Sequence, residues 1–248
     1  MYARSSVAFD ALRRLHDAVV AVALLTAVLA VVAVVAQRGF ALRGLYVPLV
    51  LAAFLAGAVV ALLTAARQLH GTFGAANHVT LARGALTSLV GGLLVAESST
   101  PVLWFAIAVA GAALALDGLD GSLARRRGVV TAFGARFDME TDALTILVLA
   151  ALVWRFGKAD AWVLLIGLMR YAFVAAGSRL PWMRAPLPPS RRRQTVCVLQ
   201  VAALLLCLAP FTSPARSTVL AAAALAALVA SFAIDTAWLA RRAASARV

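Results

Sequence analysis

The sequence predicts an all-α polytopic membrane protein with about eight transmembrane helices. Of its 248 residues, 64% are hydrophobic and the mean hydropathy is +0.95, whereas soluble domains are roughly half apolar. Several uncharged runs approach the roughly 20 residues that a bilayer span needs. We find no internal repeat and no alternation typical of β-strands. A helical bundle in a membrane accounts for these observations.

Eight apolar segments follow one another along the chain. The first contains an uncharged run from Val19 to Ala36 and comes after Arg4, Arg13 and Arg14, like the basic start of a signal peptide. Because this run is longer than a cleavable signal core, we predict a retained membrane anchor. The predicted spans cover residues 17–36, 46–66, 80–96, 101–118, 139–154, 161–177, 195–211 and 217–239.

Turn-forming residues set the limits of these segments. Pro101 starts the fourth span, four prolines fall between Pro181 and Pro189, and Pro214 marks another turn. The strongest break lies at residues 67–79, where Gly, His and Asn interrupt the apolar pattern. We therefore predict an N-terminal accessory transmembrane hairpin (residues 1–70), a six-helix core (71–242) and a cytoplasmic tail (243–248). The hairpin has no polar cluster, so we expect residues 1–66 not to be needed for chemistry.

The net charge of +13 reflects membrane topology. Most of the 23 Lys and Arg residues fall on the side of the spans that holds both termini, and the others are Arg38, Arg43, Arg155, Lys158, Arg216 and the mid-span Arg170. This bias predicts that both termini are cytoplasmic. It argues against nucleic acid as a partner and suits anionic lipid headgroups. Arginine far outnumbers lysine, as in GC-rich bacterial genes, so we expect a multi-pass protein of a bacterial inner membrane.

Four aspartates lie at fixed spacing between apolar segments. Asp117 and Asp120 are three residues apart, and Asp138 and Asp142 are four apart, so each pair shares one face of a helix. The short connection between the pairs predicts an antiparallel hairpin that brings them face to face. Ionisable groups beside membrane spans are costly and mark functional sites. Clustered carboxylates suit hard divalent cations, and two such ions can clamp a displacement at phosphorus.

The same stretch resembles the signature of the CDP-alcohol phosphatidyltransferase family, D-x-x-D-G-x-x-A-R, eight residues, then G-x-x-x-D-x-x-x-D. Every fixed letter is present: Asp117, Asp120, Gly121, Ala124, Arg125, Gly134, Asp138 and Asp142. A shorter signature, Asn-x-x-Thr-x-x-Arg, is present as Asn77, Thr80 and Arg83. The resemblance covers about residues 71–242, so the first two spans lie outside it.

The resemblance implies a transferase of phospholipid biosynthesis. Such an enzyme moves a phosphatidyl group from a CDP-alcohol, for example CDP-diacylglycerol, to an alcohol acceptor and releases CMP. The family implies that one or two Mg²⁺ or Mn²⁺ ions bind to Asp117, Asp120, Asp138 and Asp142, with Asp142 also the general base. The residues implied in CDP binding are Thr80, Arg83, Gly121, Ala124, Arg125, Thr131 and Gly134.

Arginines near the predicted cytoplasmic surface are more numerous than topology requires. We predict that an anionic acceptor, such as a phosphorylated polyol, binds to Arg170, Arg179, Arg191, Arg192 and Arg193. The pair Arg170-Tyr171 differs from the Arg-Glu pair frequent in family members that use glycerol phosphate, which points away from that acceptor.

A competing function from another class stays open. Intramembrane carboxylates also serve ion pathways, so the alternative is an ion- or proton-coupled transporter. The aspartates lie at predicted helix ends rather than at the midplane, which favours the enzyme. The sequence is also compatible with a homodimer.

Overall fold

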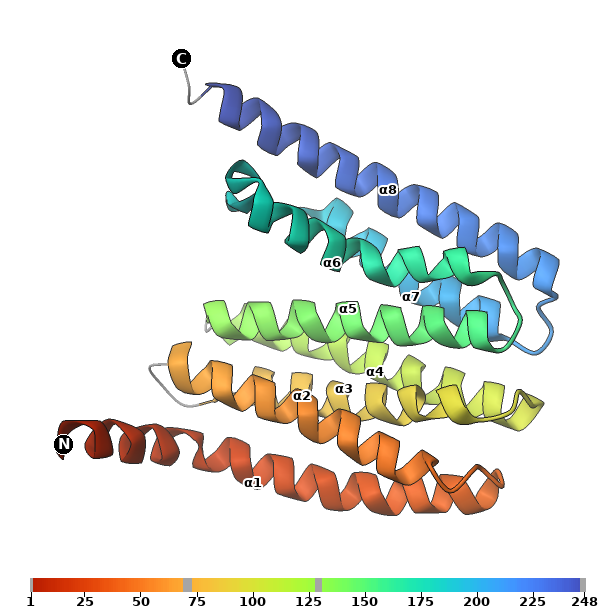
Figure 1. Cartoon of the computed structure of the whole chain (residues 1–248), viewed down its shortest axis with the longest axis horizontal. Helices are drawn as coiled ribbons and strands as arrows, with labels where there is room; N and C mark the ends of the chain where they lie inside the picture. The colour runs from red at the N-terminus through yellow and green to blue at the C-terminus, as the bar shows by residue number, and fades with distance from the viewer. Residues whose placement is uncertain (1, 69–72, 128–130, 246–248) are drawn as a thin grey trace. The chain divides into compact units, whose positions relative to one another are not determined.

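Helices form wherever the sequence carries its long apolar runs. The structure, a computed structural model, describes residues 2–68, 73–127 and 131–245, and the side chains of residues 15–68, 73–118 and 131–245. Its α-helices are α1 (Tyr2–Gly39), α2 (Tyr46–Gln68), α3 (Ala75–Gly92), α4 (Thr100–Arg127), α5 (Ala132–Arg155), α6 (Leu164–Arg179), α7 (Arg191–Leu208) and α8 (Pro214–Ser245) (Figure 1). Three short 3₁₀ turns are η1 (Leu93–Val95), η2 (Ala161–Val163) and η3 (Pro181–Arg184). These residues include no strand, so the predicted all-α fold is confirmed.

Six of the described helices are long and apolar enough to cross a membrane. They are α1 from Leu15, α2, α3 with η1, α4 up to Gly118, η2 with α6, and α8. The helices α5 and α7 fall outside this group because α5 carries three acidic residues in its first half and α7 begins with three arginines. The described residues form eight α-helices, one for each predicted span, and all but the spans at 139–154 and 195–211 are among the six apolar helices. These six make the chain a multi-pass membrane protein.

The chain divides into two compact units, residues 1–142 and residues 143–248. The first unit contains α1 to α4 and the start of α5, and the second contains the rest of α5 with α6, α7 and α8. The N-terminal hairpin therefore belongs to the same unit as the aspartates. The sequence predicts a domain boundary near residue 70, and α1 and α2 contact α3 across that position.

In the first unit, α3 packs against α1, α2 and α4. Tyr46 of α2 is fully buried, and its hydroxyl donates to the carbonyl of Leu89 on α3 at 3.1 Å. Gly92 allows this approach, because a Cβ there would lie 2.8 Å from Tyr46 Cε2 and would collide with Val50. Small residues have this role between membrane helices, where van der Waals packing rather than hydrophobicity drives association.

Replacing Gly92 with alanine should lower the free energy of unfolding by about 1–3 kcal/mol, because the neighbours of the new methyl group are themselves buried. Thermal unfolding of the purified protein in detergent measures the effect. Gly84→Ala on the same helix is the matched control, since nothing lies within 4 Å of a Cβ at that position. Alanine is the better helix former there. Equal melting temperatures for the two variants would contradict this account of α2 and α3.

An aromatic cluster fixes the start of α5 within the first unit. Phe73, just before α3, lies with its ring centroid 6.0 Å from that of Phe133 and 6.3 Å from that of Phe137. Residues of α1 and α2 complete this core, which consists of Leu15, Ala18, Ala65, Phe73 and Phe133, with Leu62 and Phe137 packed against it. The first turns of α5, which lead to Asp138, thus rest partly on the N-terminal hairpin.

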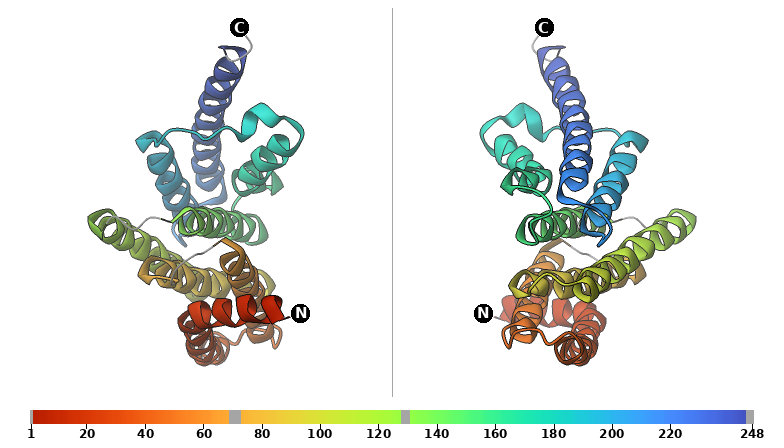
Figure 2. Two further views of the ribbon diagram at one scale, coloured as in Figure 1. Left: turned by 90° about the vertical axis from the view of Figure 1, so that its left-hand side faces the viewer. Right: turned by 90° about the vertical axis from the view of Figure 1, so that its right-hand side faces the viewer.

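In the second unit, α8 packs against α7 and α6 and stands between them in Figure 2. Polar contacts tie α7 to α8. Among them, Gln200 donates to the carbonyl of Ala224 at 2.9 Å, and the Ser217 hydroxyl donates to the carbonyl of Cys207 at 3.0 Å. Gly167 of α6 faces the backbone of Leu147 on α5, where a Cβ would collide with it.

Lys158 is also part of the packing in the second unit. The sequence suggested a topological charge, yet this residue is buried, and its ammonium group donates to the carbonyls of Ala209 at 3.1 Å and Thr212 at 2.8 Å. A buried ammonium group needs such acceptors. Lys158 thereby joins the end of α5 to the α7–α8 connection.

Candidate metal and phosphate site

The aspartates lie on α4 and α5, close to the connection between these helices. Asp117 is ten residues before the end of α4, and Asp138 and Asp142 lie in the first half of α5. Thr131 caps the start of α5, because its hydroxyl accepts a hydrogen bond from the Gly134 amide at 3.0 Å. This is the capping chemistry that favours threonine before a helix.

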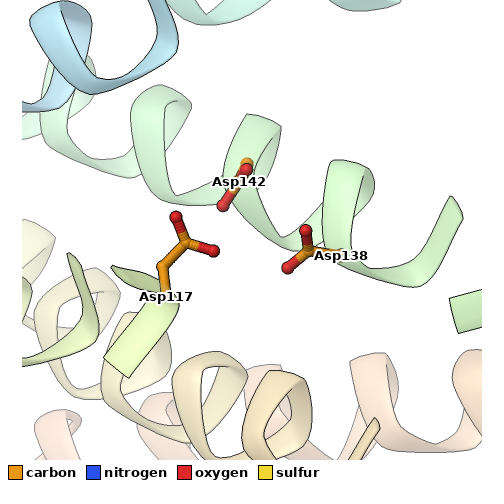
Figure 3. Close-up of side chains that lie close together, drawn as sticks. All are labelled: Asp117, Asp138 and Asp142. Carbon is orange, nitrogen blue, oxygen red and sulfur yellow. The ribbon is translucent and has the colours of Figure 1, made fainter. Parts of the chain in front are cut away.

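Three carboxylates converge across the two helices. Asp117 projects from α4 toward Asp138 and Asp142 on α5 (Figure 3), and one ligand oxygen from each residue lies within 4.8 Å of the others. The exposed fractions of their side chains are 34%, 43% and 26%. An all-oxygen, partly exposed donor set of this kind fits a Mg²⁺ or Mn²⁺ ion, which binds carboxylates together with substrate phosphates.

Arg83 of α3 lies among these carboxylates. Its side chain is only 6% exposed, and its Nη1 atom lies 3.0 Å from Asp117 Oδ1. Nη1 also pairs with Asp138, and Nη2 pairs with Asp142. One guanidinium group therefore links three helices and compensates negative charge that would otherwise be costly so close together. The resemblance implied a role for Arg83 in CDP binding and gave no indication of these ion pairs.

Gly134 and the short N-terminal signature bring α3 close to α5. Asn77 is buried and donates to the carbonyl of Phe73. A Cβ at position 134 would lie 2.8 Å from Asn77 Oδ1 and 3.0 Å from Thr131 Oγ1, so glycine allows this approach and a larger residue would push these side chains aside. Thr80 is buried, and its hydroxyl donates to the carbonyl of Ala76 at 3.2 Å. These contacts give the signature residues packing roles, while their contacts with CDP stay predictions.

Four predicted site residues lie outside the described side chains. The structure gives helical backbone for Asp120, Gly121, Ala124 and Arg125 on α4. The spacing of three residues between Asp117 and Asp120 is thus helical, as predicted. Beyond this, their roles in metal and CDP binding stay predictions.

The arginines predicted to bind the acceptor differ in their surroundings. Arg192 of α7 pairs with Asp235 of α8 at 2.5 Å and donates to the carbonyl of Ser231 at 2.6 Å. Arg193 lies 3.3 Å from the same Asp235 carboxylate and also donates to the Pro188 carbonyl. Their guanidinium groups thus hold α7 against α8. Arg170 is half-buried on α6, and the exposed members of the group are Arg179 and Arg191.

One comparison with known proteins gives a match. The family model described as CDP-alcohol phosphatidyltransferase matches residues 73–234. This range contains α3, the carboxylate cluster and most of α8, whereas α1 and α2 precede it. Nothing matches the chain among curated proteins or solved structures.

Proposed function

Because the chain belongs to the CDP-alcohol phosphatidyltransferase family, we propose that it is a divalent-metal-dependent transferase of phospholipid biosynthesis. It moves a phosphatidyl group, or a similar substituted phosphate, from a CDP-alcohol such as CDP-diacylglycerol to an alcohol acceptor and releases CMP. We place it in the inner membrane of a bacterium with both termini in the cytoplasm, where CDP-linked lipids and soluble alcohols meet. The transporter alternative is not retained, because the carboxylates lie within the region that matches a transferase family.

A single observation supports this proposal most strongly. Three carboxylates from α4 and α5 meet within 4.8 Å beside the buried Arg83 guanidinium group. Phosphoryl transfer needs positioning and charge neutralisation more than covalent chemistry. Acidic side chains that gather cations, next to an arginine fork suited to phosphate oxygens, supply both requirements.

The proposed reaction is an in-line displacement at the β-phosphorus of the CDP-alcohol. Asp142 accepts the proton of the acceptor hydroxyl, and the resulting oxygen forms a bond to the β-phosphorus. The bond between that phosphorus and the bridging oxygen breaks, and CMP leaves with the electron pair. When bound by Asp117, Asp120, Asp138 and Asp142, one or two Mg²⁺ or Mn²⁺ ions neutralise the charge that develops on the phosphate oxygens.

The CDP moiety has its own proposed set of residues. Arg125 and Arg83 offer guanidinium groups to the diphosphate, and the lack of a large side chain at Gly121 and Ala124 would let a nucleotide approach α4 closely. The full set is Thr80, Arg83, Gly121, Ala124, Arg125, Thr131 and Gly134.

Release of CMP by the purified protein tests the proposal. The protein is incubated in detergent or liposomes with CDP-diacylglycerol, Mg²⁺ or Mn²⁺ and a panel of alcohols, among them phosphorylated polyols, neutral polyols and amino alcohols. We expect CMP release that requires both an alcohol and a divalent ion. A well-folded protein that releases no CMP with any CDP-alcohol and acceptor would refute the proposed activity.

The exposed arginines support an anionic acceptor. We expect Arg179→Ala or Arg191→Ala to raise the KM for the acceptor at least tenfold, since a charged hydrogen bond to phosphate is worth about 1.5–3 kcal/mol. The KM for the CDP-alcohol should change little. Arg170→Ala tests the half-buried member of the group in the same assay.

Arg192→Ala is the contrasting variant. Because Arg192 pairs with Asp235, Arg192→Ala should lower the melting temperature of the protein more than Arg179→Ala does. An unchanged acceptor KM in the Arg170, Arg179 and Arg191 variants, or a best acceptor that is neutral or zwitterionic, would contradict an anionic acceptor site.

A further inference from the structure

Arg83 and a divalent cation would use the same carboxylates. The Nη1 atom of Arg83 contacts Asp117 and Asp138, and its Nη2 atom contacts Asp142. These are the three residues whose ligand oxygens converge within 4.8 Å. A Mg²⁺ ion at typical oxygen distances of about 2.0–2.1 Å would lie where the guanidinium group now makes its contacts.

Because both are positively charged, the Arg83 guanidinium group and a divalent metal ion cannot occupy this position together. Arg83 is buried at 6% exposure, so its attraction to the carboxylates and its repulsion of another cation are weakly screened. A divalent ion carries twice the charge and gathers the same oxygens. Binding of the ion therefore requires the guanidinium group to move away from at least some of its carboxylate partners.

The guanidinium group has an alternative set of acceptors in the proposed reaction. Among the described residues, its Nε atom has no hydrogen-bond partner, and its Nη atoms contact the three carboxylates. Phosphate oxygens match the same planar fork. A CDP-alcohol that binds together with the metal brings a diphosphate to the carboxylate cluster. The diphosphate oxygens can then replace the carboxylates as acceptors for Arg83.

We propose that Arg83 is a built-in counter-cation that competes with the divalent metal for Asp117, Asp138 and Asp142, and that it turns to the diphosphate when metal and CDP-alcohol bind together. The inference rests on the proposed function and adds that the substrate regulates metal binding. Metal alone binds weakly, because it must displace Arg83 without compensation. Metal and diphosphate bind cooperatively, and each strengthens the affinity for the other.

Titration of the full-length protein with Mn²⁺ tests this competition without measuring activity. Free Mn²⁺ is followed by its EPR signal in detergent, with and without CDP. We expect Arg83→Gln to bind Mn²⁺ at least tenfold more tightly than the wild type in the absence of CDP. We also expect CDP to strengthen Mn²⁺ binding several-fold in the wild type and much less in the variant.

Two further variants keep the test decisive. Arg43→Gln removes an arginine from an exposed ion pair with Glu97 in the same unit, so its Mn²⁺ affinity should equal that of the wild type. If Arg83→Gln does not fold, Arg83→Lys is used, because a single ammonium group cannot span the carboxylates as the fork does. Its Mn²⁺ affinity should then exceed that of the wild type.

The outcomes separate this inference from the proposed function. Mn²⁺ affinity in the Arg83 variants that equals or falls below that of the wild type would overturn the competition, even if the wild type releases CMP. Tighter Mn²⁺ binding in these variants would support it, even if no CDP-alcohol yields CMP and the proposed activity fails.

Discussion

Asp138→Asn should reduce CMP release by about 100-fold or more, the typical loss when a group that stabilises transition-state charge is removed. The Asp138 carboxylate clusters with Asp142 of the same helix and with Asp117 of α4, and it contacts Arg83. An amide in its place offers one neutral oxygen and removes a charge that a divalent ion needs. The same loss is expected for Asp120→Asn from the sequence motif. Initial rates with saturating Mg²⁺ and CDP-diacylglycerol measure both.

The control for this prediction lies on the same helix. Glu140 is exposed and does not belong to the carboxylate cluster, so Glu140→Gln should keep most of the wild-type rate. Melting temperatures show whether the variants are folded. Chelation with excess EDTA should stop the wild-type enzyme, and renewed Mg²⁺ should restore it. Near-normal turnover in Asp138→Asn, or activity that survives EDTA, would remove the metal-site proposal.

Deletion of residues 1–66 should lower the melting temperature and reduce CMP release at least tenfold. The sequence alone suggested an accessory hairpin, but α1 and α2 pack on α3, which carries Arg83. Leu15, Ala18 and Ala65 also complete the core under Phe133, at the start of the helix that carries Asp138. Without them these contacts are lost, and lipid tails replace them only partly. Because an even number of spans is removed, the remaining helices should keep their orientation in the membrane.

Expression of the hairpin as a separate chain is the control for the deletion. Residues 1–68 end with α2, so a fragment of this length contains the complete hairpin. Its co-expression with the truncated core should restore stability and turnover together. A truncated protein with wild-type melting temperature and rate would show that the hairpin is accessory, as expected from the sequence, and that its contacts with α3 contribute little.

The arrangement of the carboxylate pairs follows from local features of the sequence. Their spacing of three and four residues predicted one helix face each, and the short connection predicted that the pairs meet. The structure brings Asp117 to Asp138 and Asp142 in this way. Such reasoning succeeds because helical period and loop length are local properties of the chain.

The ion pairs of Arg83 do not follow from local features of the sequence. Its partners Asp138 and Asp142 are 55 and 59 residues away in the chain, and nothing in the local pattern distinguishes an arginine that binds phosphate from one that neutralises carboxylates. The arginines of α7 are a similar case, since Arg192 and Arg193 find Asp235 only because α7 packs against α8.

The sequence by itself determined the all-helical membrane fold and the family signature with its four aspartates, because apolar run length, turn residues and motif spacing act over short distances. Only the tertiary structure decided which charges pair, that Lys158 is buried against the α7–α8 connection, and that the N-terminal hairpin supports the helices of the site. The physical reason is that a buried charge takes the nearest acceptor in space, and packing between distant segments sets which acceptor that is.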